Sequence, residues 1–277
     1  MLFRESKVTN QALVSLVLSE GYELPQDLKT KVTQTFLRKF GNKEVVSISL
    51  IYTAEMSGAY KETDRVEQLY GPSYYEEILC GIKFRVSPFA FFQVNTPVFE
   101  NMLKKISDFA GIDSETTLMD ICCGTGAIGL CLSQHGCKKV IGVELIKQAV
   151  DNANENVKMN AHVFEGQDIE FHAGKAEDLL PALCEQQQGK IVGIVDPPRS
   201  GLHPNVLKAL RTCKGLDRLV YVSCNAQSQM ADMKHLCYEV KGKRKAPPFR
   251  PIKAVGADLF PHTSHIESII LFERSYE

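Results

Sequence analysis

Short apolar runs alternate with helical segments from about residue 116 onward, and this alternation constrains the fold more than any other feature of the sequence. The apolar runs have the length of strands, and the segments between them have helical periodicity. Such a pattern is typical of a doubly wound α/β sheet whose strands are mostly parallel. We expect strands at 116–122, 138–145, 168–174, 190–196, 217–223 and 265–274, and helices at 127–135, 146–160, 176–188 and 204–213.

Residues 1–80 follow a different pattern, which predicts a small α+β unit. Residues 11–21 and 44–55 read as strands, and the stretch at 26–41 between them reads as a helix. A chain of 277 residues has room for this unit beside one large domain, which we expect at 81–277. The small unit contains no residues to which we can assign chemistry. We expect it to be a piece of a larger domain, because its first strand starts close to Met1.

The composition is that of an ordinary soluble protein with a hydrophobic core of normal size. Hydrophobic residues make up 44% of the chain and charged residues 23%. No apolar run approaches the ~20 residues needed to cross a bilayer, and the N-terminus lacks the pattern of an export signal, so no membrane partner is expected. The formal net charge is −1. A surface that binds RNA would therefore need a local basic patch, or a basic surface from another domain.

The cysteines predict a reducing compartment. Their number is odd, and none of them forms a CxxC pair or a Cys/His group with zinc-ligand spacing, so we expect neither a disulfide scaffold nor a metal site. Most lie in apolar runs and are expected to be small, inert buried groups. Only Cys224 needs a separate argument. The nine positions are 80, 122, 123, 131, 137, 184, 213, 224 and 237.

A glycine-rich turn after the first strand of the α/β part predicts a site for an adenosine cofactor. Gly124, Gly126 and Gly129 form a GxGxxG pattern that opens a helix, and such glycines let the backbone turn tightly against a ligand. Glu144 ends the next strand, where a carboxylate can accept hydrogen bonds from both ribose hydroxyls. The pattern fits a nicotinamide dinucleotide and S-adenosylmethionine equally well.

Two further strand ends carry reactive groups, and ligands of open α/β sheets bind at the carboxyl ends of strands. One strand ends in Asp196-Pro-Pro-Arg199, where the prolines stiffen the loop that holds the carboxylate. Another ends in Ser223-Cys224-Asn225, at a strand-to-helix turn. The N-terminus of the following helix is expected to favour the thiolate of Cys224 and to lower its pKa.

Six short motifs follow one another along the chain, and they are FFQVN (91–95), DICCGTGAIGL (120–130), GVEL (142–145), DPPRSGLH (196–203), VSCN (222–225) and HIE (265–267). In this order they resemble the RNA uracil-5-methyltransferase family. AEDL (176–179) and DLFPHT (258–263) are most similar to its eukaryotic homolog A group, which acts on tRNA. The resemblance covers about residues 81–275. It implies a Rossmann-like, S-adenosylmethionine-dependent methyltransferase fold that methylates carbon 5 of a uridine, with U54 in the T loop of tRNA as the expected target.

The resemblance also implies roles for individual residues. Cys224 is the implied nucleophile, and Glu267 is the implied general base. Asp196 is implied as a catalytic carboxylate that contacts the cofactor and orients the substrate. Phe91 is implied to stack on the target base. The other implied contacts to S-adenosylmethionine are Gln93, Cys122, Gly124 and Glu144.

The chain departs from the family pattern in several ways. Ala226 stands where the family usually has a proline, which a helix start does not require. Cys122 stands where bacterial relatives often have an aromatic residue, which would alter packing near the cofactor. The cysteine cluster of iron–sulfur members is missing. We expect a fuller-length protein to carry an additional N-terminal RNA-binding module, as fuller-length relatives do. The resemblance implies tRNA as partner of a monomer in the cytosol or nucleus, with a mitochondrial relative as second choice.

A basic run near the C-terminus contains no acidic residue, and Pro247, Pro248 and Phe249 interrupt it. We expect it to be a loop that binds tRNA phosphates through Lys243, Arg244 and Lys245, although a solvated linker explains it equally well. The complete run is Lys241, Lys243, Arg244, Lys245, Arg250 and Lys253.

Three other functions are compatible with parts of this pattern. A tRNA-binding chaperone with the same fold would not need both Cys224 and Glu267. A nicotinamide dehydrogenase would share the glycine-rich turn but would leave both residues without a role. A cytosine-5 RNA methyltransferase also uses a cysteine, so only the base in the product distinguishes it.

Overall fold

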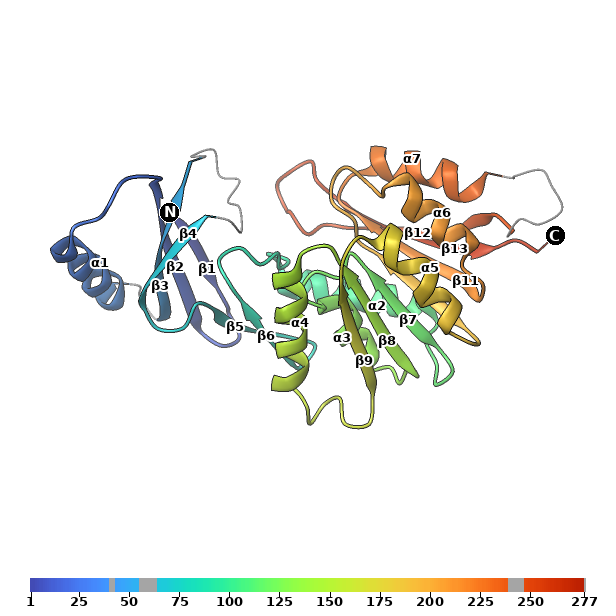
Figure 1. Ribbon diagram of the computed structural model, residues 1–277, viewed down its shortest axis with the longest axis horizontal. Helices are drawn as coiled ribbons and strands as arrows, with labels where there is room; N and C mark the ends of the chain where they lie inside the picture. The colour runs from blue at the N-terminus through green and yellow to red at the C-terminus, as the bar shows by residue number, and fades with distance from the viewer. Residues whose placement is uncertain (40–42, 55–63, 239–246, 277) are drawn as a thin grey trace. The chain divides into compact units, whose positions relative to one another are not determined.

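The computed structural model describes residues 1–39, 43–54, 64–238 and 247–276 and divides the chain into two compact units, Met1–Phe92 and Gln93–Glu277. In Figure 1 the first unit runs from blue to cyan and the second from green to red. Among the described residues, no helix is both long enough and apolar enough to cross a membrane.

The first unit contains one sheet, one helix and a separate hairpin. Its elements are β1 Leu2–Glu5, β2 Gln11–Ser19, α1 Gln26–Lys39, β3 Glu44–Thr53, β4 Arg65–Tyr70, β5 Tyr75–Leu79 and β6 Ile82–Val86. The four sheet strands lie in the order β1-β2-β3-β4, and α1 links the parallel pair β2–β3. The predicted strands and helix are confirmed as β2, β3 and α1. The expected domain boundary after residue 80 falls in the turn of the β5–β6 hairpin, whereas the two compact units divide after Phe92.

The second unit is built on a seven-stranded, mostly parallel sheet in the order β12-β13-β11-β10-β7-β8-β9. All neighbours from β11 to β9 are parallel, and β13 runs antiparallel to both β11 and β12 (Figure 1). The predicted α/β sheet is therefore confirmed. Its strands are β7 Thr117–Ile121, β8 Lys139–Glu144, β9 Asp168–Ala173, β10 Ile191–Val195, β11 Leu216–Ser223, β12 Phe249–Ala257 and β13 Glu267–Arg274.

Six helices of the described residues cover this sheet: α2 Thr96–Ala110, α3 Ala127–Ser133, α4 Lys147–Met159, α5 Ala176–Gln186, α6 Pro204–Thr212 and α7 Ala226–Cys237. Helix α2, which the sequence analysis did not predict, has clear end signals. The Asn95 side chain caps it by accepting a hydrogen bond from the Val98 amide, Pro97 lies in its first turn, and Gly111 ends it in the left-handed conformation. The helices α5, α6 and α7 pack side by side (Figure 1).

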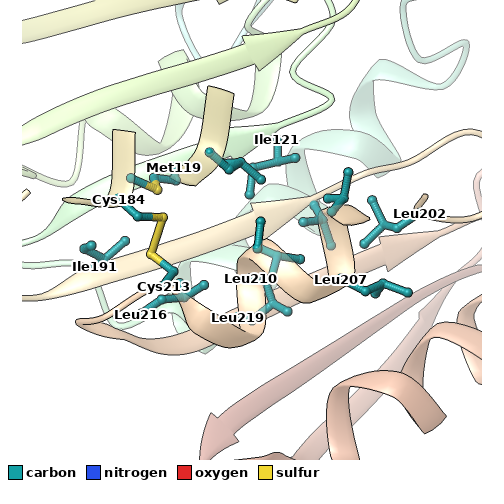
Figure 2. Packing of buried hydrophobic residues seen from close by; sticks show 14 of the residues in the cluster. Met119, Ile121, Cys184, Ile191, Leu202, Leu207, Leu210, Cys213, Leu216 and Leu219 are labelled. Carbon is teal, nitrogen blue, oxygen red and sulfur yellow. A yellow bond between two sulfur atoms is a disulfide. The ribbon is translucent and has the colours of Figure 1, made fainter. Parts of the chain in front are cut away.

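A buried hydrophobic cluster lies between the sheet and the layer of α5 and α6 (Figure 2). Leu207 and Leu210 of α6 pack with Met119 of β7 and Leu219 of β11, so the apolar face of each predicted helix meets the continuous apolar strands below it. This core fixes the positions of the strands whose ends carry the candidate site.

A disulfide joins Cys184 at the end of α5 to Cys213 after α6, inside this cluster (Figure 2). The expectation that every cysteine other than Cys224 is an inert free thiol is therefore wrong for these two residues. They are 29 residues apart in the sequence, and only the packing of α5 against α6 brings them together. None of the other seven cysteines, all of which are described, belongs to a disulfide.

The segment before β13 was expected to be one long loop, but part of it is the edge strand β12. Arg250 and Lys253 of the basic run are exposed residues of this strand, so the loop interpretation is wrong for both. Pro251 lies at the register shift between β12 and β13, where a residue without an amide hydrogen is tolerated in an edge strand. Lys241, Lys243, Arg244 and Lys245 lie outside the described residues, and their role in tRNA binding stays a prediction.

Arg274 of β13 forms hydrogen bonds with several other parts of the second unit. Its guanidinium is buried and donates to the carbonyl oxygens of Leu216 (2.7 Å), Leu210 (2.8 Å), Pro247 (2.8 Å) and Cys213 (3.1 Å). It also lies 4.3 Å above the ring of Phe249. One cation thus satisfies carbonyl groups at the end of α6 and beside β11.

Replacing Arg274 with methionine should destabilise the protein by about 2–4 kcal/mol, because several buried carbonyl groups lose a charged donor. The midpoint of urea unfolding measures this loss. Arg218→Met is the matched control, since its ion pair with Glu273 is half-exposed and should be worth about 1 kcal/mol or less. Equal destabilisation by the two substitutions would contradict the role given to Arg274.

Candidate active site

The register between β11 and β13 places the two principal candidates side by side. Ser223 pairs with Ser268 across this antiparallel ladder. Extending this antiparallel ladder by one step, from Ser223 to the residue after it and from Ser268 to the residue before it, puts Cys224 opposite Glu267. Neighbouring strands are about 5 Å apart, so a thiol and a carboxyl group flank each other at this edge of the sheet.

The parallel strands bring three more candidates to the same edge. Val195 of β10 pairs with Ile121 of β7, and Ile121 pairs with Val143 of β8. The residues that follow these three, Asp196, Cys122 and Glu144, therefore lie level with one another. Together with Cys224 and Glu267 they form one row at the carboxyl end of the sheet, which is where ligands bind in open α/β folds.

The glycine-rich turn has the backbone geometry that a bound nucleotide needs. Cys122 (φ 64°), Gly124 (φ 55°) and Gly126 (φ 80°) are all in the left-handed region, which is rare for a cysteine. The Gly124 amide donates to Glu144 Oε2 at 3.0 Å, so the acid is tied to the turn. A Cβ added to Gly124 would meet no protein atom within 4 Å. The turn thus has an open side next to a carboxylate.

Asp120 at the start of this turn is a site residue that the sequence analysis quoted without a role. Its carboxyl group is fully buried, and its Oδ2 accepts a 2.8 Å hydrogen bond from the Gly129 amide. A Cβ on Gly129 would lie 2.9 Å from the same oxygen, so this glycine is needed for close approach. Burial raises the pKa of Asp120 to about 7, and the nearby Glu144 charge acts in the same direction.

The pKa of Cys224 is raised, so the predicted lowering is wrong. Helix α7 does begin directly after it, with Asn225 as the capping residue. Burial of the thiol and the negative charges of Glu267 and Asp196 nevertheless raise its pKa, and a hydrogen bond from Arg199 opposes them only in part. The sequence pattern showed the helix end but not the carboxylates that face the sulfur.

Glu267 and Asp196 both hold their protons more tightly than ordinary carboxyl groups. Glu267 is only 3% exposed, and burial raises its pKa against the opposing charge of Arg199. Burial, followed by the charges of Glu267 and Asp120, raises the pKa of Asp196 to about 8. His262 and His265, which are close to Glu267 in sequence, are exposed. A buried glutamate with a raised pKa is suited to accept a proton near neutral pH.

Phe91 and Gln93, the two candidate site residues of the FFQVN motif, belong to different units. Gln93 is buried at the start of the second unit, two residues before the Asn95 cap of α2. Phe91 belongs to the first unit and is 71% exposed. Their implied contacts with cofactor and target base stay predictions.

Comparisons with known proteins agree with this geometry. The family model for tRNA (uracil-5-)-methyltransferase matches residues 10–275. Human tRNA (uracil-5-)-methyltransferase homolog A is 43% identical over 250 residues, which are 90% of this chain and 39% of the relative. The zebrafish (Danio rerio) homolog B is 40% identical, over 84% of this chain and 49% of the relative. The chain thus spans about two fifths to one half of these relatives.

A solved structure has the same arrangement of elements. The tRNA (uracil-54, C5)-methyltransferase of Pyrococcus abyssi, in complex with S-adenosyl-L-homocysteine, superposes with a TM-score of 0.72 and 28% identity. The alignment covers 98% of this chain and 58% of that one. The fold is therefore that of S-adenosylmethionine-dependent methyltransferases. Because the family model matches nearly the whole length of the chain, the chain belongs to the tRNA (uracil-5-)-methyltransferase family.

Proposed function

We propose that this chain methylates carbon 5 of a uridine in RNA with S-adenosylmethionine as methyl donor, and that its target is the T-loop uridine U54 of tRNA. The observation that carries the proposal is the β11–β13 register, which sets the Cys224 thiol beside the buried Glu267 carboxyl. A nucleophile next to a base is the minimum equipment for this reaction. The names of the human relative and of the archaeal structure support tRNA as the RNA.

The residues at the glycine-rich turn fit S-adenosylmethionine. Glu144 lies at the end of β8, where it would accept hydrogen bonds from ribose hydroxyls, and the open side of Gly124 leaves room for the ligand. Asp120 Oδ1 is buried and has no hydrogen-bond partner among the described residues, which adds a polar atom next to this turn. Gln93, Cys122 and Asp196 are the further proposed contacts. When bound, the cofactor supplies an activated methyl group to carbon 5.

The protein's own residues perform the remaining steps. The Cys224 thiolate adds to carbon 6 of the uracil, which forms a carbon–sulfur bond and moves an electron pair toward oxygen 4 and carbon 5. After carbon 5 has been methylated, Glu267 accepts the proton from that carbon. The released electron pair restores the carbon 5–carbon 6 double bond, and the carbon–sulfur bond breaks to give back the thiolate. Asp196, whose raised pKa lets it keep a proton, is proposed to orient the pyrimidine edge.

The target base must leave its stack before this chemistry can occur, at a cost of a few kcal/mol. Loops are where RNA bases are most readily splayed out, which fits a T-loop uridine. Stacking on Phe91 and phosphate binding by Lys243, Arg244 and Lys245 are proposed to offset the cost. A monomeric protein in the cytosol or nucleus stays our expectation.

The decisive experiment incubates the chain with unmodified tRNA and S-adenosylmethionine and identifies the modified nucleoside by mass spectrometry. We expect 5-methyluridine at position 54. Formation of 5-methylcytidine would show instead that the chain is a cytosine-5 RNA methyltransferase. Tight tRNA binding without any methylated product would show instead that the chain is a tRNA-binding chaperone.

Glu144→Ala should weaken the binding of S-adenosylhomocysteine by about tenfold or more, because a charged hydrogen-bond acceptor at the ribose is lost. Isothermal titration calorimetry measures this affinity without any RNA. Glu165→Ala, which removes an exposed carboxylate from the same unit, is the control and should bind normally. Unchanged affinity of the Glu144 variant would remove this residue from the proposed cofactor site.

A further inference from the structure

The loop of residues 196–203 carries Asp196 and joins β10 to α6. Its first residue is fixed by the sheet, because the Asp196 amide donates to the Ile121 carbonyl oxygen at 3.3 Å. The remaining residues of the loop belong to no helix or strand, so their path depends on the side chains that they meet. Asp196 is proposed to orient the pyrimidine, and a displacement of about 1 Å at such a group can lower the rate about 10²-fold. The contacts that hold this loop therefore bear on the reaction.

Asp232 of α7 holds the far end of the loop. Its side chain is only 6% exposed, and its Oδ2 accepts a hydrogen bond from the Leu202 amide at 2.8 Å. The same oxygen accepts a hydrogen bond from the Tyr221 hydroxyl of β11 at 2.6 Å. Hydrogen bonds to a carboxylate are stronger than those between neutral groups. One oxygen atom thus joins the loop that begins at Asp196 to the strand that leads to Cys224.

The loop approaches α7 so closely that position 201 requires a glycine. Gly201 has φ 81°, a left-handed value that side chains rarely allow, and a Cβ there would lie 2.8 Å from Asp232 Oδ2. The same Cβ would lie 3.2 Å from the Cβ of Ser228. Two successive loop residues thus meet one carboxylate, Gly201 by close approach and Leu202 by a hydrogen bond.

A second contact, from the start of α7, holds the middle of the loop. Asn225 Nδ2 donates to the Arg199 carbonyl oxygen at 2.9 Å, while its Oδ1 accepts from the Gln227 amide at 3.0 Å. Asn225 and Asp232 are seven residues apart, which is about two helical turns, so both face the loop. The contact of Asn225 is exposed, whereas that of Asp232 is buried, where hydrogen bonds are electrostatically stronger than in water.

We propose that Asp232 is a positioning residue for the reaction: it fixes the loop of residues 196–203, and with it Asp196, relative to Cys224. Asp232 acts through the loop backbone and not on the reacting atoms. This inference rests on the proposed function, in which Asp196 orients the pyrimidine beside the nucleophile. The Leu202 amide reports on the contact, because its exchange with deuterium requires the hydrogen bond to Asp232 to open.

The test compares variants in hydrogen exchange and in turnover. Asp232→Leu removes the acceptor with little change in side-chain size. Exchange at Leu202, measured without RNA by mass spectrometry with fragmentation to single residues, should become about tenfold faster or more, since a hydrogen bond to a charged group is lost. The kcat of tRNA methylation should fall about tenfold or more. The KM for tRNA should change little, because affinity for RNA comes mainly from phosphate contacts.

Asp232→Asn is the conservative variant, because an amide oxygen can accept the same two hydrogen bonds. It should keep kcat within about threefold of the unaltered chain and should keep most of the protection at Leu202. Gly201→Ala disturbs the same contact from the loop side, so it should give both effects of Asp232→Leu. This second variant keeps the proposal open to test if Asp232→Leu does not fold.

Ile106→Ala is the control for lost stability alone. Ile106 is fully buried on α2, so the variant loses core packing but keeps the hydrogen bonds of the loop. Its kcat should be unaltered, and so should the exchange at Leu202 relative to the amides of β8. Circular dichroism confirms that each variant is folded. An unaltered kcat or unaltered exchange at Leu202 in folded Asp232→Leu would overturn the proposal, and so would an equal fall of kcat in Ile106→Ala.

Exchange and turnover separate this proposal from the proposed function. If the unaltered chain methylates no RNA while exchange at Leu202 still depends on Asp232, the proposed function fails and the hold of Asp232 on the loop is supported. If methylation occurs and exchange at Leu202 does not respond to Asp232→Leu, the function is supported and the positioning role is overturned.

Discussion

Replacing Cys224 with alanine will abolish methyl transfer and will also abolish the covalent complex with RNA that contains 5-fluorouridine. Fluorine at carbon 5 cannot be removed as a proton is, so the proposed reaction of the unaltered chain should stop at the adduct between sulfur and carbon 6. Without the sulfur no adduct can form. Loss of a covalent nucleophile lowers turnover by several orders of magnitude, and we expect a fall of about 10⁴-fold or more.

The adduct is detected as a slow band on a denaturing gel and mapped by mass spectrometry. Cys237→Ala is the matched control, because Cys237 is a free, partly exposed cysteine on the helix that follows Cys224. It should leave both adduct and turnover unaltered. An adduct that persists in Cys224→Ala, or one that maps to Cys122, would contradict the assignment of the nucleophile.

The sequence was sufficient to predict six of the seven strands of the sheet and the polar residues at their ends. Continuous apolar runs end at Glu144, Asp196 and Cys224, and parallel strands necessarily bring such ends to one edge. The pairing of Cys224 with Glu267 needed the structure, because nothing in the sequence fixes the register between β11 and an antiparallel β13.

Three predictions from the sequence were wrong, and each has a local physical reason. Strand β12 begins among prolines and cations and is an exposed edge strand, so it lacks the apolar pattern that marked the other strands of its sheet. The disulfide between Cys184 and Cys213 depends on the packing of two helices. The pKa of Cys224 was given the wrong sign because the helix that starts at Ala226 is visible in sequence, whereas Glu267 opposite the thiol is not.

Arg199 illustrates a signal that was present but not interpreted. It stands in the DPPR motif, which drew attention to Asp196 and to the stiffness of the prolines. Its effect on the pKa of the Cys224 thiol, and the hydrogen bond that its carbonyl oxygen accepts from Asn225, become visible only when the ends of β10 and β11 are brought together.

Replacing Glu267 with glutamine will trap the reaction after the methyl group has been transferred. The amide cannot accept the proton from carbon 5, so the bond between Cys224 and carbon 6 cannot break. Ordinary uridine-containing tRNA should then give a stable covalent complex that already carries the new methyl group, while turnover falls about 10³-fold or more. The normal enzyme should not accumulate this complex.

The same assignment predicts the pH dependence of turnover. Burial raises the pKa of Glu267, so its basic form is lost as the pH falls through a value above that of an ordinary glutamate. The acid limb of the profile should therefore lie at higher pH than a solvated glutamate would give. Glu273→Gln on the same strand is the control, because Glu273 is half-exposed and paired with Arg218. If Glu267→Gln turns over normally, or stops before methyl transfer, another group is the base.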